Sequence, residues 1–222
     1  MRGWERKKRM AANKKVFILE EHLQDEALDL FQYTHIRAYH ACRPLDIQEY
    51  LIKGIQVINK KKSLKESLVR IKSDFVNDKE IEKEFNKHWR ALDNIHKRVW
   101  LAVNKEILLT DSSHYLIYGS EFINALAMEL GCRSSLKETG IPTIFHCDVP
   151  VESISLKIIM DIEKLVQMGY VDDITIDVNG VDSQDIINYE HPKEMPDPYF
   201  YNVKYRPNYM ELKVKGYTSI KL

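Results

Sequence analysis

Alternation of apolar and polar residues predicts the strands of this chain. Residues 142–151 read PTIFHCDVPV and residues 172–180 read DDITIDVNG, so that successive side chains point to opposite faces of an extended segment. Ile36–Arg43 (IRAYHACR) is a compact strand candidate that stops at Pro44, and Val99–Asn104 (VWLAVN) qualifies by β-propensity. The residues from Met210 onward alternate as well, which predicts a final one-sided strand.

Apolar residues three or four positions apart predict the helices. Asp46 is a suitable N-cap for a short helix that closes at Gly54. Ser63 and Glu66 fit a capping box at the start of a long charged stretch, which breaks at Asn77–Asp78. The expected helices cover 20–33, 46–54, 63–98 with that break, 118–131 and 155–168.

The charged stretch is expected to form two helices that pack as a layer beside the sheet. Its apolar positions are Leu64, Leu68, Ile71 and Phe75 before the break, and Ile81, Phe85, Trp89, Leu92 and Ile95 after it. In the later helix 118–131, Phe122, Leu126 and Met128 are expected to be buried.

These elements predict one α+β domain over residues 1–222. We expect a basic arm (1–15), an N-terminal helix (16–35), a helical layer or insertion (60–98), and an α+β core formed by 36–58 and 99–222. The composition agrees, because 44% apolar and 30% charged residues are ordinary for a globular protein.

Charge and cysteine usage narrow the class further. The longest apolar run, Val99–Val103, is far shorter than the roughly 20 residues that span a bilayer. Three widely spaced cysteines argue against a disulfide scaffold, so we expect a cytoplasmic protein. Seven Lys/Arg against one Glu give residues 1–15 a net charge of +6 within a neutral chain. That arm is either a solvated terminus or a contact for nucleic acid or an acidic partner.

Several familiar motifs are missing from the sequence. It contains no GxGxxG and no GxxxxGK[ST], so the usual phosphate cradles are absent. His35 and His40 are five apart, and His88 and His96 are eight apart, so neither pair shares a helical face. We therefore expect no metal site.

The segment AYHACRP (Ala38–Pro44), followed by LDIQEYLIKGI (Leu45–Ile55), carries the most information about function. A strand that ends in His and Arg, before a short helix that ends in Lys-Gly-Ile, resembles the opening motif of the ADP-ribosyltransferase superfamily. The later segments YLIYGSEFINALAMELG, IPTIFHCDVPVESI and DDITIDVNGVDSQDI follow in the expected order. The resemblance spans about Ile36–Ile187 and implies a split antiparallel sheet.

The resemblance implies an NAD-binding set made of Tyr39, His40, Arg43 and Tyr115. A neutral imidazole at His40 suits a ribose diol, and the planar fork of Arg43 suits a pyrophosphate. The alternatives are a core histidine at His40 and a surface charge at Arg43. Tyr118, which precedes Gly119, is preferred over Tyr115 for stacking on nicotinamide.

The catalytic acid implied by the resemblance lies at the head of a late strand. Asp173 is the first choice, followed by Glu121 and then Asp172, although many members of the superfamily use Glu there. Glu121 also suits a helix N-terminus, where the macrodipole favours a carboxylate.

Taken together, the sequence predicts an enzyme that transfers ADP-ribose from NAD to a protein or nucleic acid. The resemblance alone implies a toxin or phage-defence role with an antitoxin as a partner. The alternative is a non-catalytic α+β module that binds protein or nucleic acid through its Tyr-rich C-terminal region or its charged helices.

Overall fold

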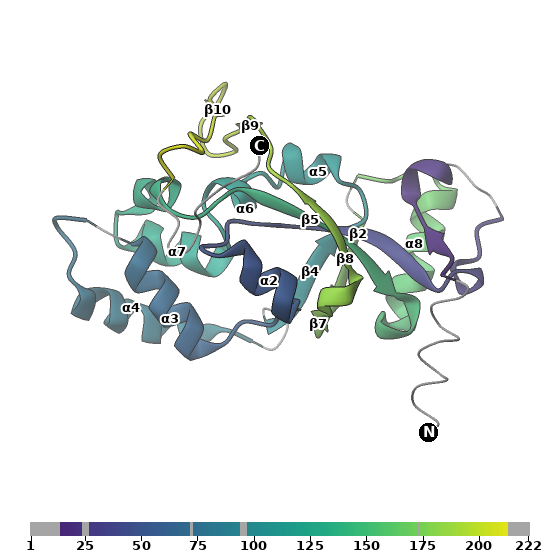
Figure 1. The fold of residues 1–222 in the computed structure, drawn as a ribbon, viewed down its shortest axis with the longest axis horizontal. Helices are drawn as coiled ribbons and strands as arrows, with labels where there is room; N and C mark the ends of the chain where they lie inside the picture. Colours follow the sequence, from purple (N-terminus) through teal and green to yellow (C-terminus); the bar gives the residue numbers. More distant parts are fainter. Residues whose placement is uncertain (1–13, 24–26, 72, 94–96, 173, 213–222) are drawn as a thin grey trace.

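A computed structural model describes residues 14–23, 27–71, 73–93, 97–172 and 174–212. Its centre is an antiparallel sheet in the order β6–β4–β2–β5–β8, and a short β1 runs parallel to β2 (Figure 1). The strands are β1 (Val16–Phe17), β2 (His35–Cys42), β4 (Val99–Ala102), β5 (Thr143–Pro150), β6 (Thr175–Val178) and β8 (Ile186–Glu190). Two small sheets pair β3 (Ile55–Gln56) with β7 (Gly180–Val181), and β9 (Met195–Pro196) with β10 (Lys204–Tyr205).

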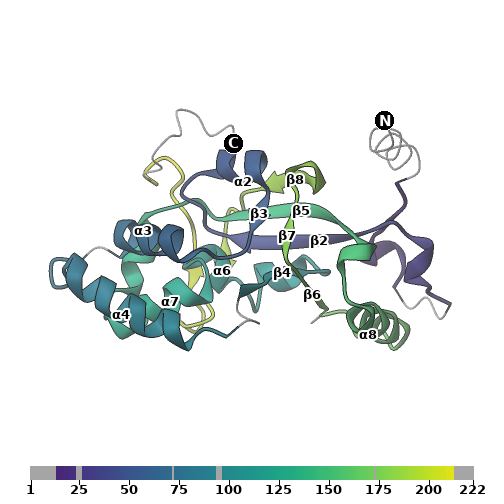
Figure 2. The same cartoon turned by 90° about the horizontal axis from the view of Figure 1, so that it is seen from below.

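The helices gather at the two ends of the sheet, as Figures 1 and 2 both show. One end carries α3 (Lys60–Arg70), α4 (Asp78–Ala91) and α7 (Glu121–Glu129), and α8 (Leu156–Gln167) lies at the other. The shorter helices are α2 (Ile47–Lys53), α5 (Glu106–Leu109) and α6 (His114–Ile117). Further 3-10 turns occupy 19–21, 30–32, 133–138, 151–153 and 183–185.

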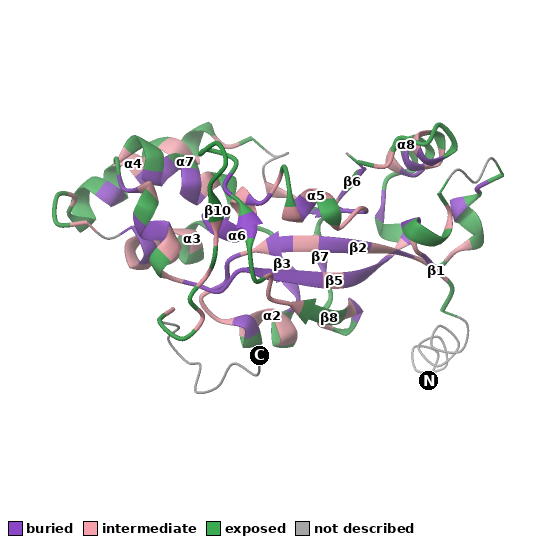
Figure 3. Cartoon of the chain, turned by 90° about the horizontal axis from the view of Figure 1, so that it is seen from above, coloured by how far each residue is buried: buried purple, intermediate pink, exposed green. Residues whose placement is uncertain are grey.

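Strand β2 serves two hydrophobic cores, one on each face. Ile36 and Ala38 belong to the core that includes α8, whereas Tyr39 and Ala41 belong to the core under α4 and α7. This division follows from the pleat, since neighbouring residues point to opposite faces. Figure 3 shows that β5 is buried along most of its length, that buried and half-buried residues mix along β2, and that the outer sides of the helices are exposed.

The sheet is weakly joined between β2 and β4. Eight consecutive residue pairs connect β2 to β5 and four connect β4 to β6, but the single pair Tyr39↔Ala102 connects β2 to β4. The pairing of β2 with β4 is therefore the sparsest in the six-stranded sheet.

Local sequence signals position the helix that follows β2. The Asp46 side chain accepts a hydrogen bond from the amide of Gln48, and Gly54 ends α2 with φ 76°, as expected. A Cβ at Gly54 would lie 2.1 Å from the carbonyl oxygen of Val181, so only glycine allows β3 to meet β7 this closely.

The predicted N-terminal helix over 20–33 is wrong. The described residues form separate 3-10 turns at Leu19–Glu21 and Leu30–Gln32. The Asp29 side chain accepts from the amide of Phe31, and the amide of Leu30 donates to Glu163 on α8. These bonds to side chains replace the bonds of a continuous helix.

The helical layer forms, but with different boundaries. Its break is confirmed, because Asn77 and Glu80 make the capping box that starts α4. The box expected at Ser63 and Glu66 is wrong, since Asn59 caps α3. Phe75 follows the end of α3 and is 92% exposed, and Ile95 lies outside the described residues.

Later elements depart from expectation in three places. Met128 was expected inside α7 but is exposed at its end. Strand β8 and the β9–β10 hairpin have no counterpart among the expected strands. Residues 210–212 form a turn rather than a strand, and the rest of that expected strand lies outside the described residues.

Phe85→Ala tests whether the helical layer is part of the core. Phe85 is fully buried and stacks on Trp89 at 5.5 Å, so we expect a loss of about 3–5 kcal/mol in the free energy of unfolding. Phe75→Ala, at an exposed site, should change it by less than about 0.5 kcal/mol. Denaturant titration of both variants makes the comparison. Equal stability of the two would contradict this packing.

Candidate functional site

His40 lies on β2, next to Tyr39, whose pair with Ala102 is the one residue pair that joins β2 to β4. Its Nδ1 is 2.9 Å from the backbone oxygen of Trp100 on β4. Because a carbonyl oxygen only accepts, Nδ1 carries the proton and Nε2 is left as an acceptor. Burial lowers the pKa of His40, although the bond to Trp100 acts in the opposite direction, and the ring is therefore neutral at pH 7.

The acceptor atom of His40 is available. Nε2 has no hydrogen-bond partner within the described chain, and it is not among the buried atoms that lack one. A hydroxyl group can therefore donate to it.

Trp100 holds His40 through its backbone, but by the alternation of β4 its side chain lies on the opposite face of the sheet. That side chain is 44% exposed, which is unusual for an indole on an inner strand. An exposed indole provides a flat surface for another ring. The sequence analysis did not select Trp100, because β-propensity alone does not reveal that its side chain is open.

Tyr39 faces a polar part of the sheet, away from His40. Its ring meets His146 edge-on at 5.1 Å, and the Nε2 of His146 is 3.6 Å from a carboxylate oxygen of Glu190. Burial lowers the pKa of His146. His146 occupies a polar position of the alternating segment 142–151, and that alternation was the available signal.

Asp148, next along β5, has two cationic partners. It accepts from Nε of Arg37 at 2.5 Å and pairs with Nζ of Lys14 at 2.8 Å. Burial acts to raise the pKa of Asp148, but the bonds from Arg37 and Lys14 outweigh it and hold the pKa below its usual range. The carboxylate therefore stays ionised at neutral pH.

Arg43 lies in the interior, where its donors are already engaged. The guanidinium donates to the carbonyl oxygens of Thr139, Leu116 and Lys137, and to the hydroxyl of Tyr205. Burial lowers its pKa to about 10, so it remains charged at neutral pH. These contacts give Arg43 a role in joining chain segments, and the geometry lends no support to a pyrophosphate contact.

Tyr118 is also buried and bonded. Its hydroxyl donates to Asp197 at 2.6 Å, and its ring belongs to the core under α4 and α7. Tyr115 is half-buried, and its hydroxyl donates to Glu121 at 2.8 Å. The structure therefore separates these two tyrosines in role: Tyr118 packs in the core, and Tyr115 lies near the surface with Glu121.

The three expected acids have different positions. Asp173 lies outside the described residues, and Asp172 is in an exposed turn. Glu121 is exposed and is the first residue of α7, a position that suits a helix N-terminal acid.

Asp185 is a carboxyl that the sequence analysis missed. It lies directly before β8 and is 9% exposed, and its carboxyl makes no hydrogen bond or ion pair with any described residue. Burial raises its pKa; Lys14 opposes the rise, and Asp182 and Asp148 add to it. The segment GVDSQDI was noted, but β8 was not expected, so its head was not identified.

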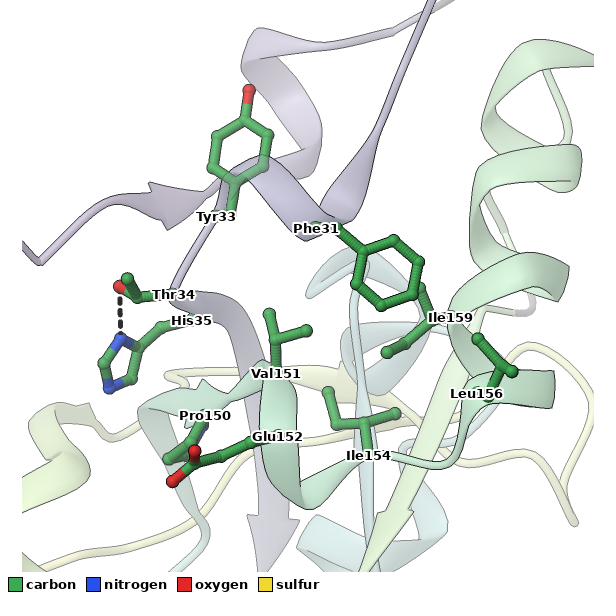
Figure 4. Close-up of a pocket in the computed structure, with 10 residues that line it drawn as sticks. All are labelled: Phe31, Tyr33, Thr34, His35, Pro150, Val151, Glu152, Ile154, Leu156 and Ile159. Atoms are coloured by element: carbon green, nitrogen blue, oxygen red, sulfur yellow. Dashed lines mark hydrogen bonds between the residues drawn. The ribbon is translucent and has the colours of Figure 1, made fainter.

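A cavity lies at the end of the sheet that carries α8. Its volume is about 550 Å³. Most of the side chains that line it are apolar (Figure 4). Phe31, Ile154, Leu156 and Ile159 line it, and the His35 ring, bonded to the Thr34 hydroxyl, lies at its side. No expected site residue lines this cavity.

Metal-ligand clusters and membrane spans are both absent from the described part of the chain. No group of three or more His, Cys, Asp or Glu side chains there is arranged to hold a metal ion. None of the helices in that part is long and apolar enough to cross a bilayer.

No family model, curated protein or solved structure matches the sequence or the fold.

Asp148→Asn tests the ion pairs on the polar face. We expect it to lower the free energy of unfolding at pH 7 by about 2 kcal/mol, because it removes two charge-assisted hydrogen bonds at a buried atom. Because the pKa of Asp148 is lower in the folded protein than in the unfolded chain, where it is near 3.9, its ionised form stabilises the folded state above about pH 3.9. This stabilisation is lost as the pH falls through the pKa of the folded state.

The difference in the free energy of unfolding between the wild type and Asp148→Asn should therefore become smaller below about pH 4. Asp172→Asn, in an exposed turn, provides the matched control. Urea titrations at pH 7 and pH 3 measure both variants. A difference that persists unchanged at pH 3 would refute the assignment.

Proposed function

We propose that this chain is an ADP-ribosyltransferase that uses NAD as its co-substrate. The observation that supports it best is the position of His40, which lies next to the one pair that joins β2 to β4 and is fixed by the carbonyl of Trp100. The resemblance of Ala38–Ile55 assigns a ribose contact to this same residue. The sparse pairing of β2 with β4 is compatible with the split sheet that the resemblance implies.

The chemistry of His40 fits part of NAD. His40 offers one acceptor nitrogen, which suits a ribose hydroxyl. Trp100 is exposed too, but the pleat points its side chain to the face of Tyr39 and Ala102, opposite His40, and Tyr118 is buried, so we assign no stacking residue to the nicotinamide ring. Tyr39 and Arg43 support the strand and its surroundings in this proposal.

A carboxylate is needed for the reaction. Breaking the bond between nicotinamide and ribose builds positive charge on the sugar, as in glycoside hydrolysis. A fixed carboxylate in a partly buried site stabilises that charge without reorganisation. We assign this role to Asp185, because its side chain is buried and makes no ion pair with a described residue. It lies directly before β8, whose Ile186 is level with Ala38, two strand intervals (about 10 Å) across the sheet and two residues along β2 from His40.

The acceptor is proposed to be a macromolecule, either protein or nucleic acid. The net charge of +6 on residues 1–15 and the Lys-rich α3 favour a large, acidic partner. The competing proposal is a non-catalytic interaction module, for which NAD would have no role.

Release of nicotinamide from NAD by the purified protein tests the proposal. Asp185→Asn keeps the shape and removes the charge, and we expect the rate to fall about 100- to 1000-fold. His40→Ala should raise the KM for NAD, because it removes a contact to the bound ribose. Circular dichroism and thermal unfolding confirm that each variant is folded.

Three further variants act as controls for the choice of acid. Asp172→Asn and Glu121→Gln change exposed carboxylates and should leave the rate unchanged, and Asp173→Asn tests the acid first expected from the sequence. A loss confined to Asp173→Asn would reject Asp185. No nicotinamide release by the wild-type protein, alone or with cell lysate as a source of acceptor, would favour the interaction module.

A further inference from the structure

A second cavity lies at the end of α7, beside the β9–β10 hairpin. It measures about 370 Å³ and is lined by Met128, Gly131, Arg133, Ser134 and Phe200. Phe200 belongs to the tip of the hairpin, which projects from the body of the molecule in Figure 1. None of the residues assigned to NAD lines this cavity.

Arg133 is held by aromatic rings rather than by a carboxylate. Its guanidinium carbon lies 4.2 Å from the ring centre of Tyr199, 5.3 Å from that of Tyr118 and 5.7 Å from that of Phe200. Its nitrogens make no hydrogen bond or ion pair with any described residue, and none of them is among the buried unpartnered atoms. Ring contacts occupy the faces of a guanidinium and leave its in-plane N–H donors free for an anion.

The hairpin is anchored at its base, so the tip is presented by a fixed support. Asp197, buried at the start of the tip, accepts from the Tyr118 hydroxyl at 2.6 Å and from Nζ of Lys137 at 2.9 Å. The Tyr199 hydroxyl accepts from the side-chain amide of Asn124 at 2.9 Å. Ser113 donates to the carbonyl of Pro196 at 2.6 Å.

The tip exposes aromatic surface that the fold does not use. Phe200 is 48% exposed and Tyr201 is 94% exposed. Beyond the tip, Lys204 and Arg206 both bond to Glu194, so this part of the hairpin keeps an excess positive charge. Aromatic rings for bases and cations for phosphates are the combination that binds single-stranded nucleic acid.

We propose that this cavity and the hairpin tip bind single-stranded nucleic acid. One base enters the cavity against Phe200, and Arg133 donates to the adjoining phosphate. A neighbouring base stacks on Tyr201. This site acts independently of the proposed NAD chemistry, and its occupant is a nucleotide strand rather than a folded protein.

Fluorescence anisotropy of a labelled 12-nucleotide single strand, titrated with the full chain at 50 mM salt, tests the proposal. We expect Phe200→Ala to weaken binding about tenfold, because one stacked base is lost. Arg133→Gln should weaken binding and also reduce the slope of log K against log salt by about 0.7, since one phosphate contact disappears. A duplex of the same sequence should bind more weakly than the single strand.

Tyr170→Ala is the matched control, because Tyr170 is 64% exposed in the turn that follows α8. It should leave binding unchanged. Equal weakening by Tyr170→Ala, or an unchanged salt slope in Arg133→Gln, would overturn the proposal. No binding by the wild-type protein would overturn it too, and would leave the hairpin as a surface for protein partners.

Discussion

The ladder between β2 and β5 is the constraint on which the rest of the structure depends. Its eight consecutive pairs fix which residues of β2 face each core. A slip of β2 by one residue would move Arg37 into an apolar core and Ile36 out of it, so the register is strongly specified. The same register brings Asp148 to Arg37 and His146 to Tyr39. On its other side β2 pairs with β4 only at Tyr39↔Ala102, and His40 next to this pair bonds the carbonyl of Trp100.

Two buried arginines join the helical end of the molecule to the sheet. Arg43 reaches three segments, at Leu116, 137–139 and Tyr205, through carbonyl and hydroxyl oxygens, and Arg70 donates to the carbonyls of Arg43 and Tyr118. Burying a guanidinium is costly unless its donors are bonded. These carbonyls, with Glu66 for Arg70, provide most of the bonds, and Nε of Arg70 has no partner among the described residues. A Cβ at Gly119 would lie 2.6 Å from Arg70, so a glycine is required beside it. These contacts place α6 and α7 against the end of β2.

Sequence patterns predicted the elements whose signals are local. Alternation located β5 and β6, and the caps at Asp46 and Gly54 located α2. The predicted helix over 20–33 does not form, although the apolar residues have helical spacing. The amide of Leu30 bonds to the side chain of Glu163, and the amide of Phe31 bonds to the side chain of Asp29, instead of to helical carbonyls. Likewise, β8 is short and mostly exposed, so it carries no alternating pattern.

The candidate site was predictable in part for the same reason. His40 was selected from its place in a motif, but its tautomer depends on a carbonyl 60 residues away. The burial of Arg43 and Tyr118, the exposure of Trp100 and the isolation of Asp185 depend on long-range packing that no local pattern encodes.

The central claim is that neutral His40 presents Nε2 to the ribose of NAD. Nitrogen NMR of the 15N-labelled imidazoles, with and without NAD, tests it most directly. We predict an Nδ1–H tautomer for His40 and a change in its Nε2 resonance on adding NAD. An Nε2–H tautomer, or an Nε2 resonance that saturating NAD leaves unmoved, would contradict the account.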